Sequence, residues 1–134
     1  MIQVDVFRLH EDAVVPSYGT SLSTCFDLGF YPSKSDPIVN GYDKYNLKVE
    51  RHMSGDGVYV NPGDRLLVPT GLIFKIRDKR NPIESFADIT TEREELQQFS
   101  IRLHARSGMA LKRGLVLANA EGVVDVDYQQ QVYI

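Results

Sequence analysis

The sequence predicts an all-β fold, a jelly-roll-like distorted barrel that carries one short helix. Three observations lead to this class. Apolar and polar residues alternate in several short runs, turn-forming clusters separate these runs, and long amphipathic helical patterns are almost absent. The 134 residues, 43% of them hydrophobic, suffice for one globular core. We therefore expect a single domain over residues 1–134.

The clearest strand pattern runs from Phe99 to Arg106, where every second residue is apolar. The sequence Asn-Pro-Gly-Asp at 61–64 is a dense turn signal, and Pro69 within the following β-rich stretch indicates an edge position or a bulge. Residues 115–128 are apolar at first and then alternate. This pattern predicts a buried strand that runs into an exposed strand end.

Two polar stretches interrupt the β-rich sequence. The first, near 33–57, is expected to form a long surface excursion, an irregular hairpin. The second lies near 77–98, where Thr91 and Glu94 match a capping box and predict a short helix.

Composition excludes several classes of protein. The formal charge of −3 argues against a nucleic-acid binder, because such proteins concentrate Lys and Arg to release counterions. No apolar run is long enough to span a bilayer, so we expect no membrane association. Cys25 is the single cysteine and no leader pattern precedes the chain, which favours a reducing, cytoplasmic setting. The three histidines stand apart, so a protein-liganded structural metal is not expected.

The strongest local signal for chemistry is the segment from Arg106 to Gly114. Ser107 can cap a short helix that Gly114 ends, which would leave the N–H groups of Ser107, Gly108 and Met109 free to bind an anion. Arg106 would add a planar fork for phosphate oxygens, with Lys112 and Arg113 close in sequence. The plainer alternative, a capped helix with basic surface residues, is the commoner meaning of an Arg-Ser-Gly triplet alone.

Two acidic positions complete the candidate set. Asp125 closes the alternating run that leads to Tyr128, and Asp27 lies between hydrophobic residues in Phe26-Asp27-Leu28. Taken alone, the first is more often a soluble turn beside a half-buried aromatic residue. The second is more often a turn or cap residue than a metal contact.

Together these segments resemble the dUTPase family, whose members share five short motifs in fixed order. Phe26-Asp27-Leu28 resembles the first motif, although Thr24-Cys25 replaces a small Ala-Gly pair. Arg106-Ser107-Gly108 with the residues up to Gly114 resembles the second, and the run Asn119 to Tyr128 resembles the third. Pro62-Gly63-Asp64 and Pro69-Thr70-Gly71-Leu72 also lie where members place a strand pair.

The resemblance implies a dUTPase-like (β-clip) enzyme that hydrolyses dUTP to dUMP and pyrophosphate with Mg²⁺. Asp125 would position the water that attacks the α-phosphorus, and Asp27 would reach the metal through water. Tyr128 would lie against deoxyribose and exclude UTP by steric conflict. Substrate contacts are implied for Arg106, Ser107, Gly108, Asn119, Gly122, Val123, Val124, Tyr128 and Tyr133.

The same resemblance implies a homotrimer whose sites combine segments of neighbouring subunits. Two departures from the family pattern stand out. Gln130 occupies a place where members have glycine in the hairpin that holds uracil, and the two polar stretches are insertions longer than the norm. We also expect the chain to be truncated at its C-terminus, before the last two motifs.

Two rival functions stay open. A dCTP deaminase shares the fold and the Arg-Ser signature, but it needs an acid farther along the strand after the third motif. A non-catalytic nucleotide sensor or partner-binding relative would retain the pocket and use the insertions as an interaction surface.

Overall fold

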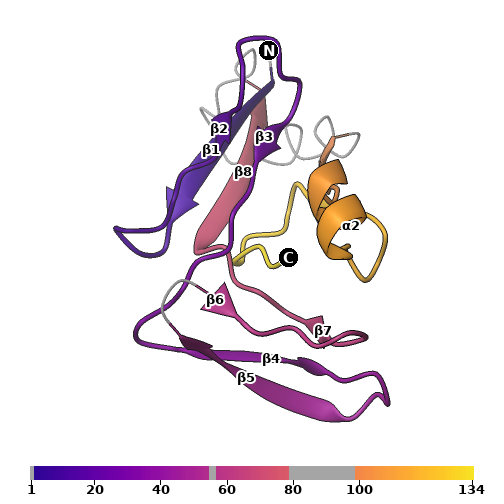
Figure 1. The fold of residues 1–134 in the computed structure, drawn as a ribbon. Helices are drawn as coiled ribbons and strands as arrows, with labels where there is room; N and C mark the ends of the chain where they lie inside the picture. Colours follow the sequence, from indigo (N-terminus) through magenta and orange to yellow (C-terminus); the bar gives the residue numbers. More distant parts are fainter. Residues whose placement is uncertain (1, 55–56, 79–98) are drawn as a thin grey trace. The chain divides into compact units, whose positions relative to one another are not determined.

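The computed structural model describes residues 2–54, 57–78 and 99–134. Short strands dominate these residues, and the all-β class with one short helix is confirmed for the described part of the chain (Figure 1). The capping box at Thr91 and Glu94 lies outside the described residues, as does most of the second insertion. The elements are β1 (Ile2–Arg8), β2 (Ser17–Tyr18), β3 (Phe26–Asp27), β4 (Ile38–Tyr42), β5 (Lys48–Ser54), β6 (Gly57–Val58), β7 (Arg65–Leu66), β8 (Leu72–Asp78), β9 (Ser100–Leu103), α2 (Ser107–Arg113) and β10 (Gly122–Asp125).

The chain forms two compact units, and each is made of separated segments. Unit 1 comprises Met1–Phe7 and Ile73–Gln130, and unit 2 comprises Arg8–Leu72 and Gln131–Ile134. The expectation of a single domain remains a prediction.

Unit 1 contains two strand pairs, β1 with β8 and β9 with β10. The β9–β10 pair is antiparallel, and its register sets Gly122 opposite Leu103 and Asp125 opposite Ser100. The alternation that predicted a strand after Phe99 is confirmed in β9, where Arg102 is exposed between half-buried neighbours. Buried side chains on β8 and β10 form the core of this unit; they are Phe74, Ile76 and Val124.

The first half of the predicted strand over 115–128 is wrong. Val116 is 67% exposed, and residues 115–117 belong to no strand. The chain leaves α2 through Gly114 in a left-handed conformation, and the Leu115 N–H donates back to the Met109 carbonyl at 3.2 Å. Because this exit and the next turn take up residues 114–121, the strand begins only at Gly122.

Unit 2 contains a four-stranded sheet in the order β6-β5-β4-β7 and the short pair β2-β3. The antiparallel β4–β5 pair confirms the hairpin expected in the first insertion (Figure 1). Its turn is organised by Asp43, whose carboxylate accepts the N–H groups of Tyr45 at 2.8 Å and Leu47 at 2.9 Å.

A second ladder in unit 2 joins residues 68–72 to residues 132–134. The N–H groups of Val68 and Ile134 each donate to the other residue's carbonyl at 2.8 Å, and Val132 N–H donates to Leu72 at 2.9 Å. Pro69 forms a bridge pair with Tyr133 between these hydrogen bonds. The missing N–H of Pro69 therefore removes no hydrogen bond from the ladder. The interruption predicted at Pro69 is confirmed, because β7 ends before it and β8 begins after it.

The predicted Asn61–Asp64 turn is also confirmed, with the Asp64 N–H donating to the Asn61 carbonyl at 2.9 Å and Gly63 at φ 89°. The turn places the Asp64 carboxylate, whose side chain is 3% exposed, against Arg51 on β5 at 2.8 Å. This hydrogen bond lowers the pKa of Asp64, and the N–H groups of Asn61 act in the same direction.

Asp64→Asn is therefore expected to destabilise the protein in a pH-dependent way. A carboxyl group whose pKa is lowered by folding stabilises the folded state above its unfolded pKa, and this stabilisation is lost as the pH falls through the folded pKa. The midpoint of thermal unfolding should be several degrees lower than in wild type at pH 7, and the difference should close at the acid end of the titration. Glu50→Gln, an exposed change on β5, is the control. Equal midpoints at pH 7 would contradict a stabilising role for this pair.

Candidate active site

Asp125 ends β10 with its side chain exposed. Gly122 and Val124 face inward and anchor the strand, whereas Val123 and Asp125 share the outer face. A β carbon at Gly122 would stand 3.1 Å from the Leu103 side chain, a tight contact, so glycine favours the close approach of β10 to β9. The predicted exposed strand end is thus present, with a carboxylate at its last position.

Tyr128 lies at the turn that follows. Its N–H donates to the Asp125 carbonyl at 3.1 Å, which reverses the chain directly after the strand, and its side chain is 39% exposed. The turn therefore holds the carboxylate and the phenol ring within three residues of each other. Their roles toward water and sugar remain predictions.

The start of α2 differs from the predicted anion seat. Arg106, extended at ψ 134°, is the N-cap residue and makes no side-chain capping bond, so the expected cap at Ser107 is wrong. Ser107 is instead the first helical residue. The Met109 N–H donates to the Arg106 carbonyl at 3.0 Å and is not available to a ligand. Ser107 and Gly108 remain as candidate amide donors, and a β carbon at Gly108 would meet nothing within 4 Å.

The end of α2 explains its other basic residues. Gly114 closes the helix at φ 65°, as predicted, and Lys112 and Arg113 lie in the last turn. Cationic side chains there interact favourably with the negative end of the helix dipole. These two residues thus lie at the opposite end of α2 from Ser107, away from the candidate amide donors.

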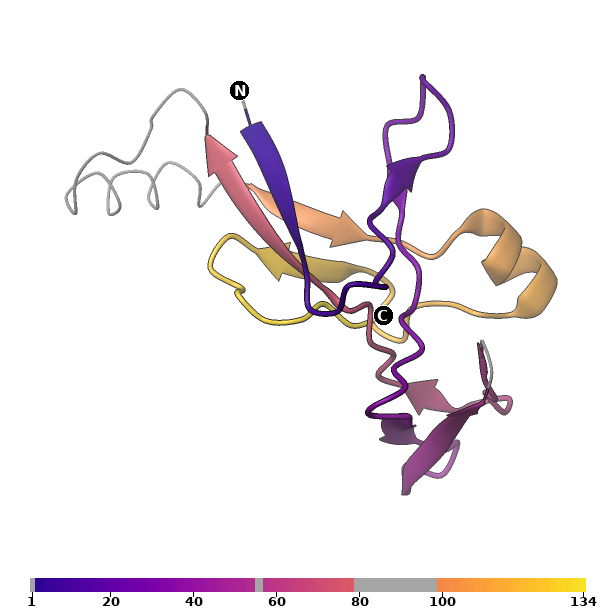
Figure 2. The same cartoon turned by 90° about the vertical axis from the view of Figure 1, so that its left-hand side faces the viewer.

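Within one chain, Asp125 and Arg106 lie toward opposite ends of the β9–β10 ladder. Asp125 pairs with Ser100 at the beginning of β9, whereas Arg106 comes after Leu103, the last residue of β9. Figure 2 shows β9 and β10 side by side, with the chain running from the end of β9 into α2. The three residue steps between these levels span about 10 Å. Within one copy of unit 1, the two residues thus belong to different levels of the ladder.

The turn that precedes β10 carries Asn119. Ala120 within it has φ 63°, a left-handed conformation that is unusual for a residue with a β carbon. The next residue, Glu121, accepts a hydrogen bond from Arg102 of β9 at 2.8 Å, and its other oxygen lies 3.2 Å from Nε2 of His104, which follows β9. Sequence reasoning passed over Glu121, because only the register of β9 against β10 reveals its partners.

The remaining predicted residues belong to unit 2. Asp27 ends β3 opposite Ser17 with its side chain exposed. Its carboxylate is a ligand type that suits Mg²⁺, although no group of three His, Cys, Asp or Glu side chains that could hold a metal occurs among residues 2–54, 57–78 and 99–134. Tyr133 is 37% exposed beside the ladder of residues 132–134. The N–H groups of Val132 and Ile134 are bonded within that ladder.

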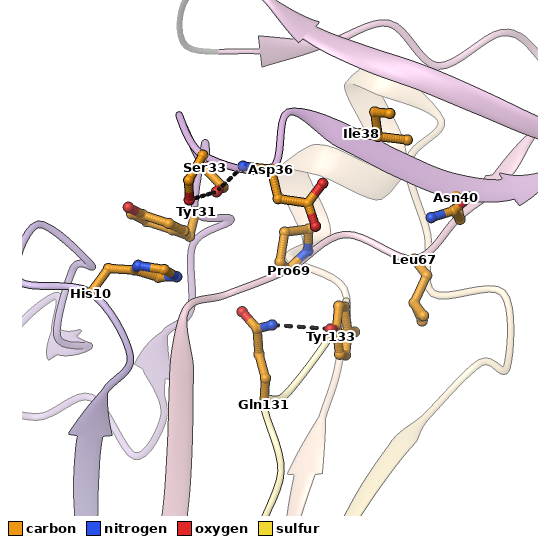
Figure 3. A pocket seen from close by; sticks show the side chains of 11 residues that line it. His10, Tyr31, Ser33, Asp36, Ile38, Asn40, Leu67, Pro69, Gln131 and Tyr133 are labelled. Atoms are coloured by element: carbon orange, nitrogen blue, oxygen red, sulfur yellow. Dashed lines mark hydrogen bonds between the residues drawn. The ribbon is translucent and has the colours of Figure 1, made fainter.

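Tyr133 also lines a shallow pocket of about 310 Å³ in unit 2 (Figure 3). The sequence did not predict this pocket. One wall is the ring of His10 stacked on Tyr31 at a centroid distance of 4.7 Å. The Tyr31 hydroxyl donates to Asp12 at 2.7 Å, and this bond raises the pKa of Tyr31 and lowers the pKa of Asp12. The lining residues are His10, Tyr31, Ser33, Ser35, Asp36, Ile38, Asn40, Leu67, Pro69, Gln131 and Tyr133.

None of the described helical residues forms a segment long and apolar enough to cross a membrane. No family model matches the chain, and no solved structure matches it.

Several curated proteins do resemble the chain, and all of those described here are named deoxyuridine 5'-triphosphate nucleotidohydrolase. The protein from Heliobacterium modesticaldum is 27% identical over 136 residues, which cover 98% of this chain and 64% of the relative. The Bdellovibrio bacteriovorus protein is 35% identical over 79% of this chain and 54% of its own length. The Shigella flexneri protein is 29% identical over 95% of this chain and 58% of its own length.

The chain thus spans between about half and two thirds of the length of these relatives. The similarity nevertheless extends over almost the whole of this chain, and the relatives agree with both the predicted family and the all-β fold. By sequence, this chain is a homologue of the deoxyuridine 5'-triphosphate nucleotidohydrolases, the dUTPase family.

Proposed function

We propose that this chain acts in the hydrolysis of dUTP to dUMP and pyrophosphate. The observation that carries the proposal is the exposed carboxylate of Asp125 at the end of β10, one turn from Tyr128, in a chain similar to dUTPases over 98% of its length. Asp125 would orient the water that attacks the α-phosphorus. An exposed carboxylate is a weak base at neutral pH, so orientation supplies more of the rate than proton abstraction does.

Arg106 and the amide groups of Ser107 and Gly108 would bind the phosphates. A guanidinium fork and helix N–H groups are the donors that phosphate oxygens accept most favourably. They would also stabilise the negative charge that develops on the leaving pyrophosphate. Asn119 would bind the base, and Gly122, Val123, Val124 and Tyr133 are proposed as further substrate contacts.

Mg²⁺ is proposed as the cofactor, held mainly by the triphosphate and reached by Asp27 through water. When bound, it would neutralise charge on the phosphate oxygens. A cytoplasmic setting, also proposed, agrees with the exposed thiol of Cys25.

A homotrimer is proposed as the active assembly. One chain holds Asp125 and Arg106 toward opposite ends of the β9–β10 ladder, and this separation supports a site that takes the two residues from different copies of the chain. Rotational symmetry would then repeat the same composite site at each interface.

The test is product release from dUTP, dCTP, dTTP and UTP with Mg²⁺ present. Pyrophosphate from dUTP alone is the expected result. Ammonia from dCTP would establish the deaminase instead, and dUTP binding without turnover would establish a non-catalytic nucleotide-binding protein. Either result would overturn the proposal.

Tyr128→Ala is expected to relax discrimination between dUTP and UTP. Removing the ring removes the steric conflict with a ribose 2′-hydroxyl, so the ratio of kcat/KM for the two substrates should fall by roughly ten- to a hundredfold. Tyr128→Phe is the matched control: it keeps the ring and should keep the discrimination. If Tyr128→Ala still rejects UTP, sugar selection resides in another residue.

A further inference from the structure

The turn before β10 is held in a conformation that its sequence does not favour. Ala120 has φ 63°, and its N–H donates to the Leu117 carbonyl at 3.0 Å. The Glu121 N–H donates to the Asn119 carbonyl only two residues away, at 2.7 Å. A left-handed residue with a β carbon persists only where the surrounding structure fixes it.

The side chain of Glu121, the residue after Ala120, contacts β9 and the residue that follows it. Both of its oxygens are engaged, Oε2 by Arg102 Nη1 at 2.8 Å and Oε1 by His104 Nε2 at 3.2 Å. Arg102 is itself braced, because its Nε donates to Ser100 Oγ at 3.0 Å. These contacts bind one end of the turn to β9.

Strand geometry explains why Ser100, Arg102 and His104 lie close to Glu121 or to each other. Residues 100, 102 and 104 alternate along the β9 direction and therefore share one face. Gly122 pairs with Leu103 in the antiparallel register. Glu121, one residue earlier, therefore lies opposite His104 and diagonal to Arg102. A β carbon at position 122 would lie only 3.1 Å from the Leu103 side chain, so glycine there favours a close approach of β10 to β9.

We infer that Glu121, held by Arg102 and His104, is a positioning residue that fixes the Asn119–Ala120 turn for binding of the deoxyuridine base. The inference rests on the proposed function. Glu121 precedes β10 and lies two residues from Asn119, so it acts on the base-binding side chain through the turn and touches no reacting atom. The Arg102 contact also balances the negative charge of Glu121.

The inference predicts a change in substrate binding with the chemical step preserved. Glu121→Ala should raise KM for dUTP about three- to tenfold and leave kcat within about twofold, since exposed ion pairs contribute modestly and Asp125 is untouched. Glu121→Gln keeps an acceptor for Arg102 and should recover most of the affinity. Glu50→Ala, an exposed glutamate on β5, is the control for removing a surface charge.

A double-mutant cycle tests the partner assignment. Arg102→Ala should raise KM in the same direction, and the double variant with Glu121→Ala should be less impaired than the product of the two single effects. Independent effects that multiply would overturn the role of the Arg102–Glu121 contact.

A second measurement is independent of turnover. Backbone ¹⁵N order parameters of Ala120 and Glu121 should fall in Glu121→Ala, and affinity for an α,β-imido dUTP analogue should weaken by the same three- to tenfold. If wild type binds the analogue and Glu121→Ala binds it with the same affinity, this inference alone is overturned. A wild-type chain that neither binds the analogue nor releases pyrophosphate would overturn the proposed function, and this inference with it.

Discussion

Asp125→Asn is expected to lower kcat for dUTP hydrolysis by about a hundredfold or more while leaving the affinity for a non-hydrolysable dUTP analogue unchanged. The amide has nearly the same size as the carboxylate and fits the same exposed strand end. It carries no negative charge, however, and it is a weaker acceptor for the proton of the attacking water. The measurements are steady-state pyrophosphate release and calorimetric titration with the analogue.

Asp127→Asn is the matched control, because Asp127 is an exposed acid in the same turn. It should change kcat by less than about threefold, since removal of a charge that does not position water has little effect on the chemical step. Unchanged turnover in Asp125→Asn, or equal losses in both variants, would end the assignment of Asp125.

Mixing inactive variants extends this prediction to the assembly. If each site takes Asp125 from one copy and Arg106 from another, trimers reassembled from equal amounts of Asp125→Asn and Arg106→Ala chains should regain about a quarter of wild-type activity. The active sites are those that take an intact Asp125 from an Arg106→Ala chain and an intact Arg106 from an Asp125→Asn chain. No recovery in exchanged trimers would show that the two residues act from the same chain.

Gly71→Ala is expected to destabilise the fold by about 2–4 kcal/mol, which corresponds to a thermal midpoint lower by about 10 °C. Gly71 has φ 71°, and an added β carbon would lie 3.0 Å from both the Ala13 side chain and the Tyr31 ring. Ala13 and Tyr31 are both buried, so a shift of either side chain would disturb its packing. Backbone strain and overpacking therefore act together.

Gly29→Ala is the matched control in the same unit, because a β carbon there meets nothing within 4 Å and the backbone has no positive φ. It should leave the midpoint nearly unchanged. Urea unfolding followed by circular dichroism measures both variants. A Gly71→Ala protein as stable as wild type would show that the segment around Ala13 can shift at little cost.

Local signals in the sequence were sufficient for several parts of the structure. Alternation located β9, the Asn-Pro-Gly-Asp run located its turn, and Gly114 located the end of α2. The acid at the end of β10 was found in the same way, because the alternation of Val124 and Asp125 places one side chain inward and the next outward. Each of these features depends on residues close together in the chain.

The features that the sequence did not predict correctly depend on residues far apart in the chain or on details that composition does not reveal. Apolar composition at 115–117 did not distinguish a loop from a buried strand, and the Arg-Ser-Gly signal did not show that Arg106 itself is the N-cap residue. The partners of Glu121 follow from a strand register, and the pocket in unit 2 joins His10 to Tyr133. Such contacts depend on pairings between distant residues, which a single sequence does not encode locally.

The interleaving of the two units has a consequence for folding during synthesis. β1 can pair only after β8, about 70 residues later, has been synthesised. The segment around Pro69 likewise can pair only after residues 132–134 have been synthesised. When synthesis has reached only residue 72, both edges are still unpaired in water, where chaperones or other nascent chains can bind them. The speed of translation between β8 and residue 130 should consequently influence the yield of native protein.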